Sequence, residues 1–208
     1  MVLTLGRLKP KLDVAQPAIR RQMRILVAYA SKAGSTKGIA EFIGEKLRQR
    51  GFQAEVQEVG SVRDLGNYDA FVIGSAVYTG HWVKEAKQFV LRNRNLLSGR
   101  PVWLFSSGPT GPQTKDSKGR DLREVSGPTE IDELKEAAHP REHRVFFGAL
   151  FGDRLGGAIG FTYRLMRRSK TVAESMPDGD YRDWKDIETW SSSIAEGLSP
   201  PTAATHQD

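Results

Sequence analysis

The sequence predicts an α/β fold: a doubly wound, five-stranded parallel sheet with helices on both faces. Between residues 24 and 197, short apolar runs alternate with stretches of helical period. A continuous apolar run bounded by turn residues is typical of a strand that is buried on both faces, as in a parallel sheet. Because parallel strands are joined by right-handed crossovers, this alternation places helices on both faces of one sheet.

Five segments have the composition of strands. The first, R-I-L-V-A-Y-A at 24–30, is an apolar run that ends in a small polar loop, and D-A-F-V-I-G-S at 69–75 has the same character. Gly99 and Pro101 introduce a third such run, V-W-L-F-S. The expected strands cover residues 24–30, 54–59, 69–75, 102–106 and 144–150.

Amphipathic stretches separate the expected strands. Ile39, Ile43 and Leu47 recur four residues apart on one helical face, and Gly51 supplies a C-terminal stop. Residues 107–128 are rich in glycine, proline and charged residues and predict a long loop. The expected helices cover residues 36–50, 83–97 and 159–168, a short segment from Thr129 to Ala138, and a last segment that Asp183 caps.

The composition is that of a soluble globular protein with one domain. The chain has 208 residues, of which 38% are hydrophobic and 27% are charged. It has no cysteine, which excludes disulfides and cysteine-ligated metals, and its four histidines have no metal-ligand spacing. We therefore expect no metal site and a cytoplasmic location.

The positive charge is concentrated near the N-terminus. The net charge is +6, and residues 1–24 contribute +5 of it, as six basic side chains and Asp13. The remainder is nearly neutral, so the charge does not indicate nucleic-acid binding. Residues 1–22 predict a disordered basic arm, either a leader or an artefact of an upstream start with Met23 as the natural first residue. The domain is expected to span 23–197, followed by a polar tail at 198–208.

The loop after the first strand has the chemistry of a phosphate site. A strand, a tight loop and a helix in succession direct backbone N–H groups and a helix N-terminus at one point. Three hydroxyls can donate hydrogen bonds, and the glycine allows close backbone approach. An ordinary turn before a capped helix is the alternative, and the lysine also suits a solvated position. The residues expected to bind phosphate are Ser31, Lys32, Ala33, Gly34, Ser35 and Thr36.

This loop resembles the phosphate loop of the flavodoxins. That family has T-x-T-G-x-T in this place, where the present chain has S-K-A-G-S-T. The glycine and the last hydroxyl agree, whereas Ser31 and Ala33 depart from the pattern and one hydroxyl donor is missing. The resemblance implies bound flavin mononucleotide (FMN) and the strand order 2-1-3-4-5. That order places ligands beyond the carboxyl ends of the strands, at the switch point.

Two further loops are expected at the same edge of the sheet. The loop after the third strand has a glycine and aromatic rings that can stack on a flat ligand. The loop after the fourth strand has small residues and hydroxyls for close contact with a ring. Tyr78 can alternatively cover the sheet edge, and His81 can cap the next helix. The residues expected to frame the ring are Ser75, Ala76, Val77, Tyr78, Thr79, Gly80 and His81, with Ser106, Ser107, Gly108, Pro109 and Thr110.

The downstream half has a more specific resemblance. The motifs V-I-G-S-A-V-Y-T-G-H, F-F-G-A-L, F-T-Y-R-L-M-R-R-S and D-Y-R-D-W-K-D-I-E-T-W resemble the flavodoxin-like menaquinone-dependent protoporphyrinogen dehydrogenases and their uncharacterised flavodoxin-domain relatives. The resemblance covers about residues 23–197, and the loop at 107–128 departs from it.

This resemblance implies an FMN-dependent oxidoreductase that passes electrons from a reduced donor to a quinone. A porphyrinogen is one candidate for the small-molecule donor. No catalytic acid or base can be named, and His81 is the titratable residue of the three loops with a suitable pKa. A flavodoxin-type electron carrier and a non-catalytic flavodoxin-fold binding module are the alternatives.

A basic helix near residues 159–170 interleaves arginines with aromatic and aliphatic side chains. Such a helix can lie on an anionic membrane near lipid-soluble quinone, or attract the propionates of a porphyrin. A helix packed on the domain with a solvated charged face is the alternative. The expected location is cytoplasmic in both cases, with a peripheral contact at the inner face of the membrane under the first interpretation.

Overall fold

The structure is a computed structural model that describes residues 21–152, 156–169 and 177–198. Its centre is a parallel sheet in the order β2-β1-β3-β5-β6. Counted among the parallel strands alone, this order is 2-1-3-4-5, which confirms the predicted topology. The strands are β1 (Arg24–Ala30), β2 (Gln53–Glu58), β3 (Ala70–Tyr78), β5 (Val102–Ser107) and β6 (Glu142–Phe146).

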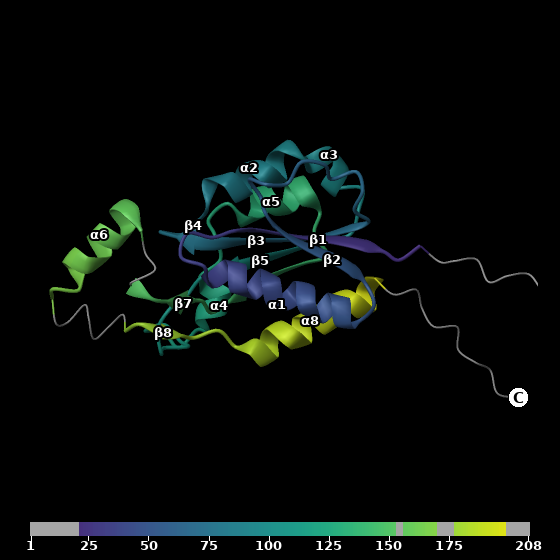
Figure 1. The fold of residues 1–208 in the computed structure, drawn as a ribbon. Coiled ribbons are helices and arrows are strands. Elements are labelled where there is room, and N and C mark those ends of the chain that lie inside the picture. Colours follow the sequence, from purple (N-terminus) through teal and green to yellow (C-terminus); the bar gives the residue numbers. More distant parts are fainter. Residues whose placement is uncertain (1–20, 153–155, 170–176, 199–208) are drawn as a thin grey trace, which may run out of the picture.

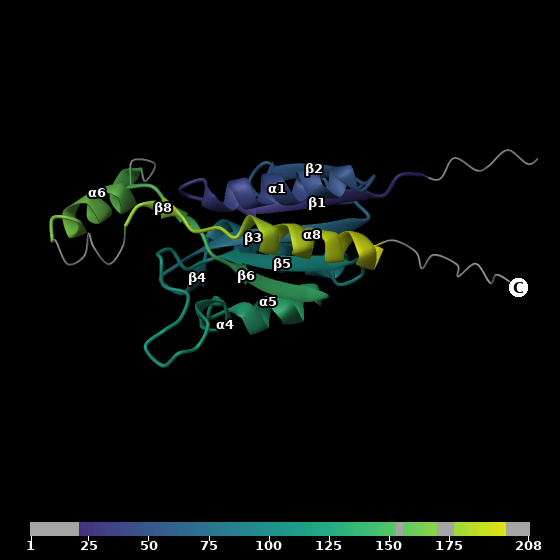
Figure 2. The ribbon, with the colours of Figure 1, turned by 90° about the horizontal axis from the view of Figure 1, so that it is seen from below.

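Helices cover both faces of the sheet, as expected (Figure 1). One layer contains α1 (Ser35–Gln49) and α8 (Trp184–Leu198), which lie side by side (Figure 2). The other contains α2 (Lys84–Arg92), α3 (Arg94–Leu97) and α5 (Ile131–Ala138).

Each face of the sheet packs into its own hydrophobic core. Ile25 and Val27 of β1 belong to the core under α1 and α8, whereas Leu26 and Ala28 belong to the core under α2, α3 and α5. Successive side chains of a strand point to opposite faces, so a strand between two helical layers must be apolar throughout. This explains the unbroken apolar run of β1.

Tight packing at the centre of the sheet depends on Gly74. Gly74 of β3 is paired in register with Phe105 of β5, and a Cβ at Gly74 would lie 2.0 Å from Phe105 Cζ. Phe105 also contacts the rings of Phe146 and Trp190, with centroids 6.2 and 6.1 Å away. The glycine therefore provides the space in which this fully buried ring lies.

Two predicted boundaries were wrong because the chain folds back on itself. The third strand continues to Tyr78, turns through Thr79 and Gly80 with φ values of 49° and 80°, and pairs antiparallel with β4 (His81–Trp82). The last expected strand ends at Phe146, and the chain then forms β7 (Ala149–Leu150), which pairs with β8 (Gly179–Asp180).

Two helix predictions also need correction. The expected helix 83–97 is divided at Asn93 into α2 and α3. Thr129 does not begin α5, because its hydroxyl donates to Gly80 O instead of capping the helix. Asp183 does lie at the start of α8, where its Oδ1 accepts from the backbone N–H groups of Lys185 and Asp186.

The expected basic helix is α6 (Gly157–Met166), which projects beyond the layers (Figure 1). A short helix, α4 (Leu122–Val125), interrupts the long loop that was predicted at 107–128.

Residues 1–20 and 199–208, which hold most of the expected arm and tail, are outside the described residues, whereas Leu198 belongs to α8. Within the described ranges, every helix is too short or too polar to cross a bilayer.

Candidate functional site

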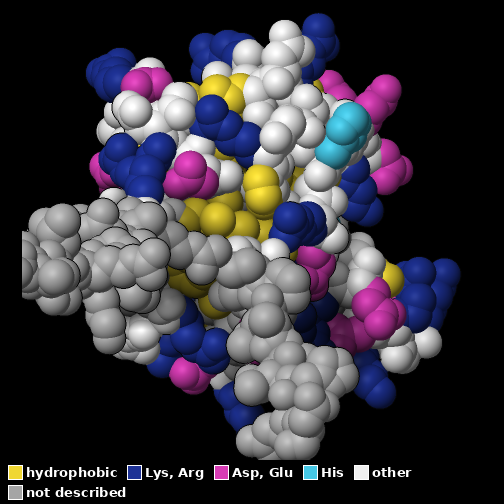
Figure 3. Space-filling view, turned by 90° about the vertical axis from the view of Figure 1, so that its right-hand side faces the viewer, with side chains coloured by type: hydrophobic (Ala, Val, Ile, Leu, Met, Phe, Trp, Pro, Cys, Tyr) yellow, Lys and Arg dark blue, Asp and Glu magenta, His cyan; other side chains and the backbone are white. Residues whose placement is uncertain are grey.

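A cavity of about 630 Å³ lies at the carboxyl ends of β1, β3 and β5. All three loops predicted to bind a ligand contribute to it, and α6 and the segment after β6 complete its wall. Figure 3 looks onto the opposite end of the sheet, where basic and acidic side chains are interspersed. The lining residues are Ser31, Ala33, Ser35, Thr36, Ala76, Val77, Tyr78, Thr79, Ser107, Gly108, Thr110, Gly148, Ala149, Leu150, Thr162, Tyr163 and Met166.

The first loop leaves the N-terminus of α1 open toward the cavity. Gly34 precedes the helix with φ 85°, a left-handed conformation that glycine adopts without strain. Its N–H donates to Ser31 Oγ at 3.0 Å, which fixes the loop. Among the described residues no side chain caps α1, and its first turn has no acidic residue. The free N–H groups and the helix dipole therefore favour an anion at this point.

The hydroxyl of Thr36 is a candidate ligand-binding group. Its side chain is 0% exposed and lines the cavity, and Oγ1 has no hydrogen-bond partner among the described residues. A buried hydroxyl without a partner costs about 1–3 kcal/mol, so such groups are rare unless a ligand satisfies them. A phosphate oxygen at the start of α1 would accept its proton. The residues present thus fit an FMN phosphate.

Ser35 joins the first loop to two distant segments. Its Oγ accepts a hydrogen bond from Ala149 N at 2.8 Å and lies 3.3 Å from Ser107 Oγ. Gly148 fits between these groups, since a Cβ there would be 3.2 Å from Ser107 Oγ and 3.3 Å from Ser35 Oγ. Three segments far apart in the sequence therefore meet beside the N-terminus of α1.

Tyr78 forms an aromatic wall of the cavity at the end of β3. Burial raises the pKa of its phenol, so the ring stays neutral at physiological pH. Lys32 is not in the lining; its ammonium lies 5.1 Å from the centre of the Tyr78 ring. The lysine predicted to bind phosphate thus holds this ring in a cation–π contact.

The wall formed by α6 was not predicted. Tyr163 is buried against Leu150 and Ala33, and its hydroxyl donates to Asp178 Oδ1 at 2.8 Å. Burial, followed by this hydrogen bond, raises the pKa of Tyr163. The motifs F-F-G-A-L and F-T-Y-R-L-M-R-R-S hold all of the missed lining residues, which are Gly148, Ala149, Leu150, Thr162, Tyr163 and Met166.

Some predicted residues lie outside the cavity lining because they have structural partners. Ser75 is fully buried; its hydroxyl donates to Ala76 O and accepts from Val83 N. The His81 side chain is 60% exposed, and its Nδ1 pairs with Glu130 Oε2 at 3.0 Å. His81 therefore lies outside the cavity lining and is held by Glu130. The predicted residues outside the lining are Lys32, Gly34, Ser75, Gly80, His81, Ser106 and Pro109.

Ser106 is part of a buried hydrogen-bond chain. Trp82 Nε1 donates to Ser106 Oγ at 2.8 Å, and Ser106 Oγ lies 2.9 Å from His143 Nε2. An indole N–H can only donate, so the serine proton is free to point at His143 Nε2, which then must be unprotonated. Burial, aided by the charge of Lys135, lowers the pKa of His143 to about 4.

We expect the free energy of unfolding to fall as the pH decreases from about 6.5 toward 4. The unfolded chain binds a proton at His143 near its ordinary pKa of 6.5, whereas the folded chain resists it until about 4. The stability that the neutral ring contributes is fully present above about pH 6.5 and is lost progressively as the pH falls toward about 4. Urea titrations at several pH values measure the free energy of unfolding. The variant His143→Gln, which keeps a hydrogen-bond acceptor, should weaken its dependence on pH. An equally steep dependence in the variant would contradict this role.

A doubly wound parallel sheet in this strand order, with an open helix N-terminus after its first loop, is the flavodoxin-like fold. The chain belongs to the Flavodoxin domain family, whose model matches residues 26–174. It is 24% identical over 190 residues to "Protoporphyrinogen IX dehydrogenase [quinone]" of Escherichia coli strain K12, across 86% of this chain and 99% of that protein.

Solved structures share the fold. Oxidised Flavodoxin 2 from Bacillus cereus matches with a TM-score of 0.53 and 21% identity, over 84% of this chain and 99% of its own. The rubredoxin oxygen:oxidoreductase from Desulfovibrio gigas matches with a TM-score of 0.53 and 12% identity, over 84% of this chain and 36% of its own.

Proposed function

We propose that the protein is an FMN-dependent oxidoreductase that passes electrons from a reduced organic donor to a quinone. The buried hydroxyl of Thr36, which has no partner in the described part of the chain and lies at the open end of α1, supports the FMN phosphate. The E. coli relative, whose name includes both protoporphyrinogen IX and quinone, supports the donor and the acceptor. A porphyrinogen is therefore the proposed donor class.

Three groups of residues would hold FMN. Ser31, Ser35 and Thr36, with the N–H groups at the start of α1, would bind the phosphate. The segments 76–79 and 107–110 would lie along the flavin ring, with Tyr78 as its aromatic wall. When bound, FMN supplies the capacity to take up and release electrons, which no side chain of this chain has.

The residues that line the cavity contribute mainly its shape and its shielding from water, and they contribute little to proton transfer. The cavity lining contains no carboxylate, histidine, lysine or arginine among the described residues. Its ionisable groups are Tyr78 and Tyr163, and the pKa of each is raised. A donor that loses two electrons and two protons per cycle must therefore pass its protons to the quinone, which becomes a quinol, through water or the reactants themselves.

The test is the oxidation of FMN-loaded protein by a quinone. The protein is loaded with FMN, reduced without oxygen by a stoichiometric amount of dithionite, and mixed with menadione while absorbance is recorded. We expect oxidation to be faster than that of reduced free FMN at the same concentration, and protoporphyrinogen to restore the reduced spectrum. A quinone rate no greater than that of free FMN would contradict the enzyme and favour an electron carrier.

We also propose that α6 contacts an anionic membrane. Phe161, Leu165 and Met166 are 65%, 51% and 50% exposed, which is unusual for large hydrophobic side chains. Arg164 and Arg168, on the same segment, are also exposed. Met166 also lines the cavity, so the cavity opens on the surface that carries these side chains. Lipid-soluble quinone would thus enter from the membrane.

Vesicle sedimentation tests the membrane contact. We expect the protein to sediment with vesicles of phosphatidylglycerol and phosphatidylcholine in equal parts, and less with phosphatidylcholine alone. Phe161→Ser with Leu165→Ser should reduce binding by about tenfold or more, since each buried side chain contributes about 1.5–3 kcal/mol. Val125→Ser, at a 39% exposed position in α4, is the matched control. No binding by the unaltered protein, or an equal loss in the control, would rule the contact out.

A further inference from the structure

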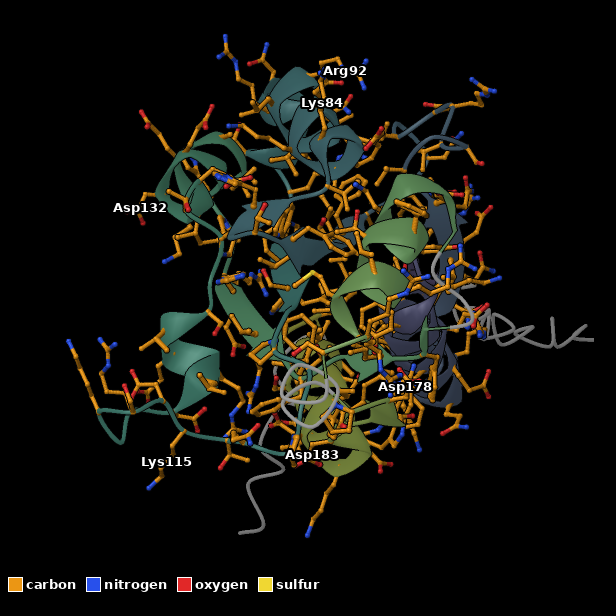
Figure 4. All side chains as sticks on the ribbon, turned by 90° about the vertical axis from the view of Figure 1, so that its left-hand side faces the viewer. Lys84, Arg92, Lys115, Asp132, Asp178 and Asp183 are labelled. Atoms are coloured by element: carbon orange, nitrogen blue, oxygen red, sulfur yellow. The ribbon has the colours of Figure 1, made fainter. Side chains whose placement is uncertain are left out.

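A second cleft, of about 300 Å³, lies against α6 beside the main cavity. Asp178, labelled in Figure 4 near α6, lies in its wall. The lining residues are Gly152, Tyr163, Arg164, Arg167, Arg168 and Asp178. This cleft plays no part in holding FMN in the account above, so its concentration of arginines needs another explanation.

The described residues of the cleft carry an excess of positive charge. Asp178 accepts hydrogen bonds from Tyr163 Oη at 2.8 Å, Arg167 Nη1 at 2.7 Å and Gly152 N at 3.1 Å. These bonds, that of Tyr163 first, lower the pKa of Asp178 and keep it charged. One carboxylate against three guanidinium groups leaves a net charge of +2.

Two of the arginines have no acidic partner among the residues that the structure describes. Within the described ranges, neither Arg164 nor Arg168 makes an ion pair, whereas Arg167 is held by Asp178. Arg164 lies in α6, Arg167 is the C-cap of that helix and Arg168 follows in the turn, and all three side chains line the cleft. Guanidinium groups that line one cleft are suited to the two oxygens of a carboxylate.

Tyr163 connects the cleft to the cavity. It lines both spaces, and the backbone of Gly152 closes against it, since a Cβ there would be 2.4 Å from Tyr163 Cε1. A molecule that lies in the cavity against the Tyr163 ring would place a charged substituent beside the arginines of the cleft. The shared wall therefore links oxyanion binding to the redox site.

We infer that the cleft holds a carboxylate of the molecule that gives electrons in the cavity, with Arg164 and Arg168 as its main donors. This rests on the proposed oxidoreductase function. It limits the donor class to molecules with an apolar body and a negatively charged carboxylate. A phospholipid headgroup has the same oxyanion chemistry, so the experiment must separate the two sources.

Equilibrium titration tests the inference without turnover. The full-length protein is titrated with mesoporphyrin IX, which has two carboxylates, and with its dimethyl ester, which has none, while the porphyrin absorbance is recorded. The same titrations use Arg164→Gln with Arg168→Gln. The control is Arg63→Gln with Arg94→Gln, which removes the same charge from exposed arginines outside both spaces.

We expect the free acid to bind about tenfold or more tightly than the ester, and the cleft variant to lose this difference while the control keeps it. Equal affinity for acid and ester in the unaltered protein would overturn the inference. So would an unchanged acid affinity in the cleft variant, and if that variant also loses sedimentation on phosphatidylglycerol vesicles, the anion is a lipid headgroup. FMN titration of the same variants should be unchanged, so failure here is distinct from failure of the flavin site.

Discussion

Replacing Thr36 by valine should weaken FMN binding by about 10- to 100-fold. Valine keeps the branched shape but removes Oγ1, which lacks a partner among the described residues. A hydrogen bond to a charged group contributes about 1.5–3 kcal/mol. Without FMN the same change should leave the free energy of unfolding unchanged or raise it, because the hydroxyl is buried and unsatisfied.

Opposite effects on affinity and stability distinguish a ligand group from a packing group. The control is Ser191→Ala, which removes a buried helical hydroxyl that donates to Ile187 O, far along α8 from the cavity. That change should lower the free energy of unfolding by about 1 kcal/mol and leave FMN affinity unaltered. FMN fluorescence titration and urea unfolding measure both quantities. Unchanged FMN affinity in the valine variant would refute the role of Thr36.

Replacing Gly74 by alanine should lower the free energy of unfolding by about 3 kcal/mol or more. The new methyl group would overlap three atoms of the Phe105 ring, at 2.0, 2.1 and 2.4 Å. Overpacking usually costs about 1–3 kcal/mol, and here the ring is held between Phe146 and Trp190. Because β3 leads directly to Tyr78, FMN binding should weaken as well.

Gly60→Ala is the matched control for this change. A Cβ at Gly60 would have no neighbour within 4 Å, and the site is exposed. Its effect on urea unfolding should stay within about 0.5 kcal/mol. If both variants unfold at the same urea concentration, the packing around Phe105 is looser than described.

The strands and their order could be predicted because burial on both faces leaves a simple signal. Ile25 and Leu26 face opposite cores, so a run of apolar residues was sufficient to identify β1. The first loop could also be located, since a glycine and small polar residues separate the apolar run of β1 from the helical pattern that follows. Ser35, Thr36 and Tyr78 line the cavity as expected.

Side-chain direction within the loops could not be predicted. Ser106 and Ser107 are adjacent, yet Ser107 lines the cavity and Ser106 bonds to Trp82 and His143. Alternation along a strand sends neighbours to opposite faces, and composition does not indicate which of two serines faces the ligand.

The wall formed by α6 depends on distant contacts. Tyr163 is held by Asp178, fifteen residues later, and Ser35 by Ala149, over one hundred residues away. Helical period identifies the helix but not the surface on which it packs.

The most direct test of the central claim compares FMN with riboflavin, which has the same ring but no phosphate. Titration of the purified, flavin-free protein, followed by flavin fluorescence, gives both dissociation constants. We expect one FMN per chain, bound about 100-fold or more tightly than riboflavin, because the open start of α1 and the Thr36 hydroxyl act on the phosphate. Equal affinity for the two flavins, or no binding of either, would contradict the account.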